Sequence, residues 1–330
     1  MKKLISVVIL LFILRIVCSQ DIHFSQFNNS PLNLNPGLTG VFNGDIRLVA
    51  NQRTQWRSVT TPYVTYGLAA DFKQVFSNFN FGLGIYNDKA GDSEFSTLQI
   101  APTIVYSLQI GDSTQNLTFA IQPSYVQRSI NYANLTFDNQ YDGIAYNPNL
   151  GNNEVFINSG RNYLNVHAGV AYHKTIAQRK YVEGGIAVHN INQPKQTFFS
   201  DNSIVLKQRL TIHANGSIPI SDKLDGLPSI LYMKQHKFKE IIFGGSGKYY
   251  LNNPDYKAVY LGIWYRNKDA SYLSAGLDWR DFHFGISYDF NLSSLRPASH
   301  NRGGFEFAII YIFSKYKPVI KRYKACPNYI

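Results

Sequence analysis

The chain has 330 residues, of which 16% are charged and 15% aromatic, with 23 Tyr and 22 Phe. An ordinary soluble domain carries about a quarter charged residues, so this composition argues against a typical soluble enzyme. The formal net charge is +11, but three basic residues lie in the N-terminal leader and five in the C-terminal tail, which leaves +3 on the body of the chain. Nucleic acid is therefore a poor candidate for a partner.

The N-terminus has the pattern of a secretory signal peptide, which we assign to residues 1–19. Two lysines precede an apolar run from Leu4 to Leu14, and cleavage after Ser19 would leave Gln20 as the first residue of the exported chain. Beyond residue 20, no apolar run approaches the roughly 18 residues that a membrane helix needs. We therefore expect export without a helical membrane span.

The two cysteines allow one alternative for the leader. Cys18 could be a lipidation site, although Arg15 and Val17 fit poorly before a lipidated cysteine. With cleavage after Ser19, Cys326 is the one remaining cysteine, and no internal disulfide can form.

Residues 20–44 form a Pro/Asn-rich lead-in, which we expect to lie in the periplasm or in the lumen. After it, segments of alternating apolar and polar residues recur between turn signals. About fourteen such segments are long enough to cross a membrane as strands, and the aromatic surplus suits the girdles of a membrane barrel. We therefore predict an all-β fold, a transmembrane antiparallel β-barrel over residues 45–313, with a basic periplasmic tail over 314–330. The predicted strands cover residues 45–54, 63–73, 78–88, 96–110, 115–128, 161–174, 181–192, 206–219, 227–237, 240–252, 256–267, 271–279, 281–291 and 303–313.

The alternation is clearest in FHFGISYDF, residues 282–290. Every second residue is aromatic or aliphatic, and His, Gly, Ser and Asp lie between them. FEFAIIYIF at 305–313 sets a similar apolar face against Glu306. Because side chains alternate across a strand, the apolar face is expected to meet lipid and the polar face a water-filled or plugged lumen.

The connections between predicted strands also alternate in character. The short turns GDSTQN, SDKLDG and NNPD fall on one side of the barrel, which is the periplasmic side if the first strand runs outward. The long segments 129–160, 192–205 and 292–302 all fall on the other side. Short periplasmic turns and long extracellular loops are typical of outer-membrane barrels.

Motifs for catalysis or metal binding are not found. The eight histidines are scattered, with no HExxH spacing; GGSGKYY at 244–250 lacks the spacing of a phosphate-binding loop, and no GxSxG motif is present. We expect no enzymatic activity, no metal and no cofactor.

Several stretches, in order along the chain, resemble the PorP/SprF family of type IX secretion system membrane proteins. The resemblance spans essentially the whole chain after the leader. Its motifs are DIHFSQF at 21–27, NPGLTG at 35–40, RTQW at 53–56, DKAGD at 88–92, FDNQYDG at 137–143, RGGFEFAIIYIF at 302–313 and CP at 326–327.

The resemblance implies an integral protein of the outer membrane of Bacteroidota-type bacteria that serves type IX secretion or gliding. It implies a partner adhesin with a type IX C-terminal domain, which the chain helps to export or to retain at the cell surface. The alternative is a passive channel for small solutes. Fourteen strands exceed the roughly eight whose interior side chains fill alone, although residues 20–44 could fold into the lumen as a plug.

The candidate partner-binding residues lie near the predicted extracellular loops. The alternative for those in the long loop is that they only order it; for those after the first strand, a structural role at the barrel rim is favoured over partner contact. The basic tail could dock on a periplasmic ring component of the secretion system, on peptidoglycan or on lipid phosphates, or could simply be solvated. The candidates are Phe137, Asp138, Asn139, Gln140, Tyr141 and Asp142 in the loop, and Arg53, Gln55 and Trp56 after the first strand.

Overall fold

The computed structural model describes residues 21–55, 57, 61–111, 114–151, 158–198, 204–292 and 302–314. The predicted leader, the tail beyond residue 314 and Trp56 lie outside these ranges. Within them, no helix combines the length and the hydrophobicity that a membrane span requires.

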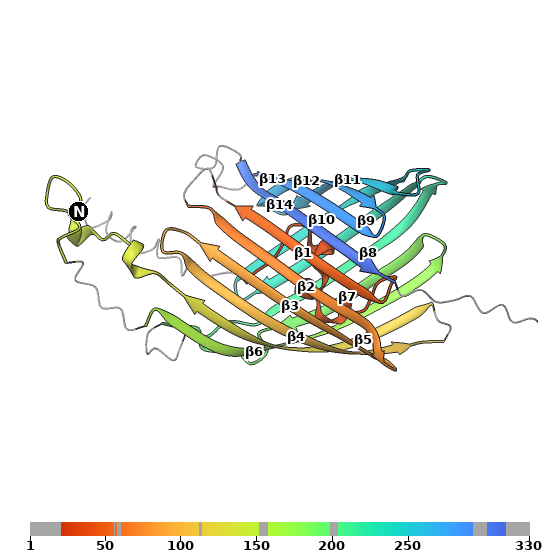
Figure 1. Cartoon of the computed structure of the whole chain (residues 1–330), viewed down its shortest axis with the longest axis horizontal. Helices are drawn as coiled ribbons and strands as arrows, with labels where there is room; N and C mark the ends of the chain where they lie inside the picture. Colours follow the sequence, from red (N-terminus) through yellow and green to blue (C-terminus); the bar gives the residue numbers. More distant parts are fainter. Residues whose placement is uncertain are drawn as a thin grey trace, which may run out of the picture.

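The described strands form one antiparallel sheet in sequence order, which closes where the first strand pairs with the last (Figure 1). The predicted all-β barrel of about 14 strands is confirmed. The strands are β1 (Ile46–Gln55), β2 (Tyr63–Phe76), β3 (Phe79–Ala90), β4 (Phe95–Gln109), β5 (Gln115–Ser129), β6 (Gly160–Ala177), β7 (Lys180–His189), β8 (Arg209–Ser221), β9 (Leu224–Gln235), β10 (Phe238–Tyr250), β11 (Tyr256–Arg266), β12 (Ala270–Trp279), β13 (Phe282–Asn291) and β14 (Arg302–Phe313).

Side chains alternate across the wall of the barrel as the sequence predicts. In β13, Ile286, Tyr288 and Phe290 are exposed on the outer surface, while Ser287 and Asp289 are buried inside. The outer surface is therefore apolar and the inner surface polar. This is the arrangement that a barrel in a bilayer needs, because closure pairs the backbone groups that hydrocarbon could not solvate.

The two ends of the barrel differ. At one end, here called the turn end, neighbouring strands are joined by short turns such as Asp222–Lys223 and Arg280–Asp281. At the other, the loop end, the connections include 130–159 and 190–208. The predicted turn SDKLDG is shorter than expected, because Asp225 already belongs to β9, where Arg179 pairs with it from the neighbouring turn.

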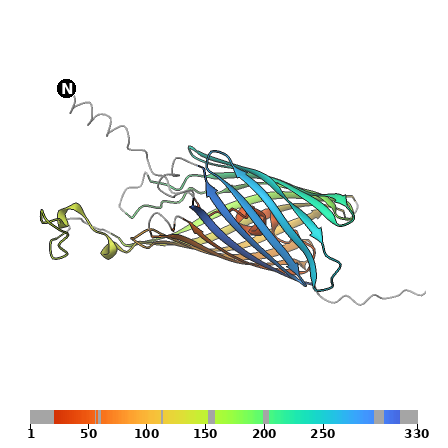
Figure 2. The same cartoon turned by 90° about the horizontal axis from the view of Figure 1, so that it is seen from above.

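Before β1 the chain forms three short helical turns inside the barrel. They are η1 (Phe27–Asn29), α2 (Pro31–Leu34) and η2 (Pro36–Leu38). Both views show this red segment within the ring of strands (Figures 1 and 2). Residues 21–45 are called the lumenal segment below. The long loop, residues 130–159, contains η3 (Tyr132–Asn134) and η4 (Asp138–Gln140) and extends well beyond the loop end (Figures 1 and 2).

Candidate functional site

The lumenal segment is held first by the last strand of the barrel. The Glu306 carboxylate accepts hydrogen bonds from the backbone N–H of Ser25 (2.7 Å) and of Gln26 (2.9 Å). From the nearby strands β12 and β11, the Tyr272 hydroxyl donates to the carbonyl of Ser25 (2.7 Å), and Arg266 donates to the Ser25 hydroxyl (2.7 Å). The bonds to Glu306 and from Arg266 are charge-assisted and so about twice as strong as neutral ones, which fixes the segment to this part of the wall.

The lumenal segment is also bound by Arg53 of β1, at the seam between the first and last strands. Arg53 lies directly opposite Glu306 in the pairing of β1 with β14, and its guanidinium Nε is 3.8 Å from the Glu306 carboxylate. Its Nη1 donates to the carbonyl of His23 (2.7 Å). The seam that closes the barrel therefore consists, at this level, of two charged side chains that both bind the lumenal segment.

Asn35 anchors the middle of the segment. Its side chain accepts from the N–H of Gly37 (2.8 Å), which caps η2, and donates to the carbonyl of Val170 in β6 (3.0 Å). Gly169 leaves the space for it, since a Cβ at that position would lie 2.0 Å from Asn35 Oδ1. A wall glycine facing a side chain of the segment is the close approach that only glycine permits.

The end of the segment is fixed by a bidentate ion pair. Arg47 donates to both oxygens of Asp71 (2.9 and 2.8 Å), and the same carboxylate accepts the N–H of Gly40 (2.8 Å). Arg47 also donates to the carbonyl of Leu38 (3.0 Å). Both charged side chains are buried, so their mutual pairing is what makes their burial tolerable.

An apolar cluster completes the packing inside the lumen. Phe27 lies edge-on to Trp264 at 5.6 Å, and Trp264 stacks on Tyr272 at 5.7 Å. Side chains from the segment and from the wall thus share a small core. It comprises Phe27, Leu34, Leu38, Ala171, Leu231, Ile242, Trp264 and Tyr272, with Met233 packed against it.

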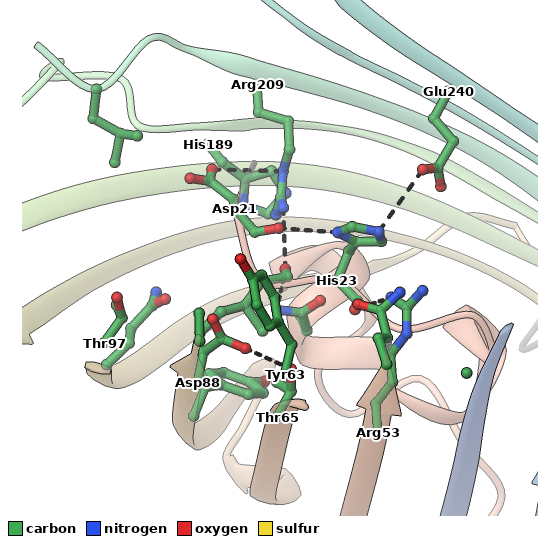
Figure 3. A pocket seen from close by; sticks show the side chains of 18 of the residues that line it. Asp21, His23, Arg53, Tyr63, Thr65, Asp88, Thr97, His189, Arg209 and Glu240 are labelled. Carbon is green, nitrogen blue, oxygen red and sulfur yellow. Dashed lines mark hydrogen bonds and ion pairs between the residues drawn. The ribbon is translucent and has the colours of Figure 1, made fainter. Parts of the chain in front are cut away.

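A cavity of about 850 Å³ lies toward the loop end, beside the first residues of the lumenal segment. We call it the vestibule; Figure 3 shows its wall, with Asp21 and His23 of the segment between side chains of the strands. The lining mixes apolar side chains with many charged ones. Its cations are Arg53, Arg128, Arg209, Lys239, Arg266 and Lys268, and its acids are Asp21, Asp88, Glu240, Asp269 and Asp289.

Several ion pairs of the vestibule are long. His23 Nε2 lies 3.8 Å from Glu240, and Arg209 Nε lies 3.9 Å from Asp21. His23 belongs to the lumenal segment and not to a strand, and its burial lowers its pKa below the usual value, which the nearby Glu240 opposes only in part. His23 is therefore neutral when the segment is docked at neutral pH.

Among the described residues, no group of three or more His, Cys, Asp or Glu side chains is placed so that it could hold a metal ion. The rings of His167 and His189 lie 5.2 Å apart, and Nε2 of His167 lies 3.0 Å from the Ser124 hydroxyl.

The predicted loop residues form a locally ordered tip. Gln140 accepts the N–H of Phe137 (3.1 Å), and the Asp142 carboxylate accepts the N–H groups of Ile144 and Ala145 (both 2.9 Å). The two backbone bonds lower the pKa of Asp142, which stays ionised. Phe137 through Asp142 are thus brought together at the tip, and the three hydrogen bonds named above stay within the loop.

Apolar side chains at this tip are unusually exposed. Ile144 is 90% exposed, Tyr141 59% and Tyr146 52%. These residues lie beyond the strands, so the hydrocarbon that would cover the outer wall of the barrel does not account for them. Exposed apolar groups gathered in one place are typical of an interaction surface.

The other predicted site residues lie apart from the loop tip. Arg53 is almost fully buried at the seam, and Gln55 lines the vestibule. Trp56 lies outside the described residues. The charged residues that hold the lumenal segment, among them Arg47, Asp71 and Asp289, were not singled out from the sequence. Because side chains alternate across a strand, the position of each acid or arginine on the polar face of its strand could have identified these residues.

The barrel is similar to solved outer-membrane channels, at low sequence identity. The CymD monoaromatic hydrocarbon channel superposes with a TM-score of 0.52 at 10% identity, covering 88% of this chain and 94% of CymD. The toluene transporter TbuX of Ralstonia pickettii gives 0.51 at 10% identity, covering 86% and 94%. The TodX ΔS2S3 mutant channel gives 0.50 at 10% identity, also covering 86% and 94%. At this identity the likeness shows the fold alone.

Sequence comparison identifies the family. No curated protein matches the chain significantly. The profile of the type IX secretion system membrane proteins PorP/SprF matches residues 16–311, which includes the lumenal segment, every strand but the last residues of β14, and the long loop. The chain therefore belongs to the PorP/SprF family of type IX secretion system membrane proteins.

Proposed function

We propose that this chain serves the type IX machinery by holding a secreted surface protein, an adhesin with a type IX C-terminal domain, at the outer face of the membrane. Family membership and the barrel fold support an integral outer-membrane location and a role in secretion or transport rather than catalysis. That the chain retains this surface protein, rather than only helping to export it, is our proposal.

The observation that carries the proposal is the tip of the long loop. Hydrogen bonds within the loop order it, and it presents Tyr141, Ile144 and Tyr146 outward. Aromatic and aliphatic side chains on a preordered surface are what protein interfaces use as anchors. A partner that covers them would remove this apolar surface from water.

The occupied lumen supports an anchor over a passive channel. The contacts of the lumenal segment reach strands around the whole circumference, from Arg47 and Asp71 through Val170 to Tyr272 and Glu306. A solute would have to displace this packed segment. We expect little ion conductance from the intact protein in planar bilayers and a clear conductance after deletion of residues 21–44.

Deletion of residues 135–150 tests the anchor directly. In cells that carry an epitope-tagged chain, the partner should be released into the medium while the barrel stays in the outer membrane at its normal abundance. The partner is first identified by mass spectrometry of what co-purifies with the tagged protein from mild detergent. An unchanged amount of partner at the surface of the deletion strain would contradict the proposal.

A further inference from the structure

Arg128 in β5 is a buried cation without an acidic partner. It lines the vestibule and is only 8% exposed. Its guanidinium lies 5.7 Å from the ring of Phe95 and 5.9 Å from the ring of Tyr163, and its Nη1 donates to the neutral side chain of Gln196. Its Nε has no hydrogen-bond partner among the described residues.

A second arginine stands beside it. Arg161 in β6 is paired directly with Arg128 in the strand register, and directly opposed residues of an antiparallel pair share one face. Their Cβ atoms are therefore about 5 Å apart. Like charges in this position destabilise a sheet. Among the described residues neither arginine forms an ion pair with a carboxylate, and Arg128 is buried while Arg161 is exposed.

The acids of the vestibule are engaged elsewhere. Asp21 accepts from Asn190 (2.6 Å), Asp88 from Thr65 (2.6 Å), and Asp269 and Asp289 pair with Arg266 (3.1 and 3.2 Å). The lining carries one more cation than acid. None of these hydrogen-bond or ion-pair partners belongs to β5 or β6, so Arg128 has no ion-pair partner among the described acids of the lining.

Burying a cation without a counter-ion is costly, and proteins meet that cost with a partner of opposite charge. We propose that Arg128 and Arg161 form a carboxylate-binding site at the mouth of the vestibule, and that its ligand is a carboxylate of the secreted partner's polypeptide. The partner's identity rests on the function proposed above, because the two arginines stand at the base of the long loop, where β5 ends and β6 begins.

The site suits one carboxylate better than a phosphate. The planar guanidinium fork matches the two oxygens of a carboxylate, and the flanking rings of Phe95 and Tyr163 limit approach to that plane. A phosphate dianion would meet stronger repulsion from Asp88 in the same lining than a singly charged carboxylate would. The cavity of about 850 Å³ has room for a short peptide beside the charged group.

Direct binding to the purified barrel in detergent tests the site. Three fluorescein-labelled hexapeptides of Ser, Gly, Val and Tyr are compared by fluorescence polarisation: one with a free C-terminus, one with a C-terminal amide, and one amide that carries a single internal Glu. We expect at least tenfold tighter binding of a peptide with a carboxylate than of the plain amide. Comparing the peptide that has a free C-terminus with the amide that carries Glu shows whether the site prefers the C-terminal carboxylate of a chain or an acidic side chain.

Variants of the arginines show whether the site is responsible. The R128Q/R161Q double variant should abolish the preference for the carboxylate, and R128K/R161K should keep only part of it, because lysine carries the charge without the fork. K239Q/K268Q is the matched control: it also removes two positive charges, both from the vestibule lining, and should leave the preference within twofold. The heat-dependent shift on SDS gels confirms that each barrel is folded.

Two results would overturn the proposal: equal binding of acidic and amide peptides, or an unchanged preference in R128Q/R161Q. Displacement of the peptides by submillimolar inorganic phosphate would also overturn the carboxylate assignment in favour of a phosphate.

The cellular test separates this inference from the proposed function. If deletion of 135–150 releases the partner but R128Q/R161Q does not, the anchor stands and the arginine site does not serve it. If the purified barrel shows the carboxylate preference while the loop deletion leaves retention unchanged, the site stands and its link to the partner falls. Release by both variants supports both.

Discussion

The lumenal segment and the long loop are both irregular, but they are ordered in opposite ways. The segment is tied to the wall by bonds that join residues far apart in sequence, such as Ser25 to Glu306 and Asn35 to Val170. The tip of the loop is tied to itself, as when Asp142 binds the N–H groups of Ile144 and Ala145. The segment is thus part of the barrel's interior, while the loop is a separate presenting surface.

This contrast separates two kinds of family motif. DIHFSQF and NPGLTG lie in the lumenal segment, where Ser25, Asn35 and Gly40 make the bonds that hold it. FDNQYDG lies in the loop, where its bonds are local. We therefore expect changes in the first motifs to alter the stability and closure of the barrel, and changes in the loop to alter partner retention alone.

Glu306→Ala should have the largest effect on the docked segment. It removes the acceptor of two backbone N–H groups and leaves Arg53 with a weaker set of partners, which costs about 3–5 kcal/mol for a broken buried pair. The melting temperature of the folded band on SDS gels should fall, and conductance in planar bilayers should rise. Glu306→Gln, which keeps an acceptor, should lose less; a wild-type melting curve for Glu306→Ala would contradict the account.

Gly169→Ala should have the next largest effect. Its Cβ would lie 2.0 Å from Asn35 Oδ1, and such overpacking costs about 1–3 kcal/mol. Combining it with Asn35→Gly should remove most of the clash, so the two changes should be strongly non-additive in thermal melts. Gly247→Ala, whose Cβ would meet only ordinary contact at 3.6 Å, is the control. Simple additivity would show that Asn35 does not occupy the space at Gly169.

His23 should give a smaller, pH-dependent effect. Free histidine has a pKa of about 6.5, and burial lowers the pKa of His23 in the docked segment, where Glu240, Arg53 and Arg266 face it. Below pH 6.5 the undocked segment therefore binds a proton that the docked segment does not, so docking weakens as pH falls and is constant above that value.

The measurement is bilayer conductance between pH 7.5 and 5.5, with a rise of at most about tenfold per pH unit. His23→Gln removes the titrating group and should flatten the profile in this range. A His23→Gln profile as steep as that of the unchanged protein would assign the pH dependence to another group.

Ile144→Ser should have the smallest effect on the barrel and a large one on the partner. The side chain is 90% exposed, and surface substitutions usually change stability by less than about 0.5 kcal/mol. Surface retention of the partner should nevertheless fall in fractionation of cells and medium. Asn149→Ser, an exposed polar change in the same loop, serves as the control, and equal retention in both strains would remove Ile144 from the interface.

The strands of the barrel wall and their two faces could be predicted from the sequence, because apolar and polar residues alternate with a period of two in strand after strand. Glu306 and the polar residues of 282–290 fall on the inner face as that alternation predicts. The ends of the strands were predicted less well. β9 begins earlier than predicted, because the polar residue Asp225 still pairs with the neighbouring strand. β7 ends earlier than predicted, because the backbone turns at Asn190, where φ is 60°.

The interior arrangement could not be read from the sequence in the same way. The partners of Ser25 and Asn35 lie more than a hundred residues away, and local patterns do not specify which inner-face side chains meet in three dimensions. The pairing of Arg128 with Arg161 likewise needs the register of β5 and β6, which spans a long loop. Tertiary contact, rather than propensity, determines these positions.

The seam has a consequence for how the protein enters the membrane. Its two strands come from opposite ends of the chain, and their opposed residues Arg53 and Glu306 both grip the segment that precedes β1. Closure of the barrel and docking of the lumenal segment therefore use the same two side chains. We expect the two events to occur together when the barrel assembles in the membrane, so that the closed wall and the filled lumen form at once.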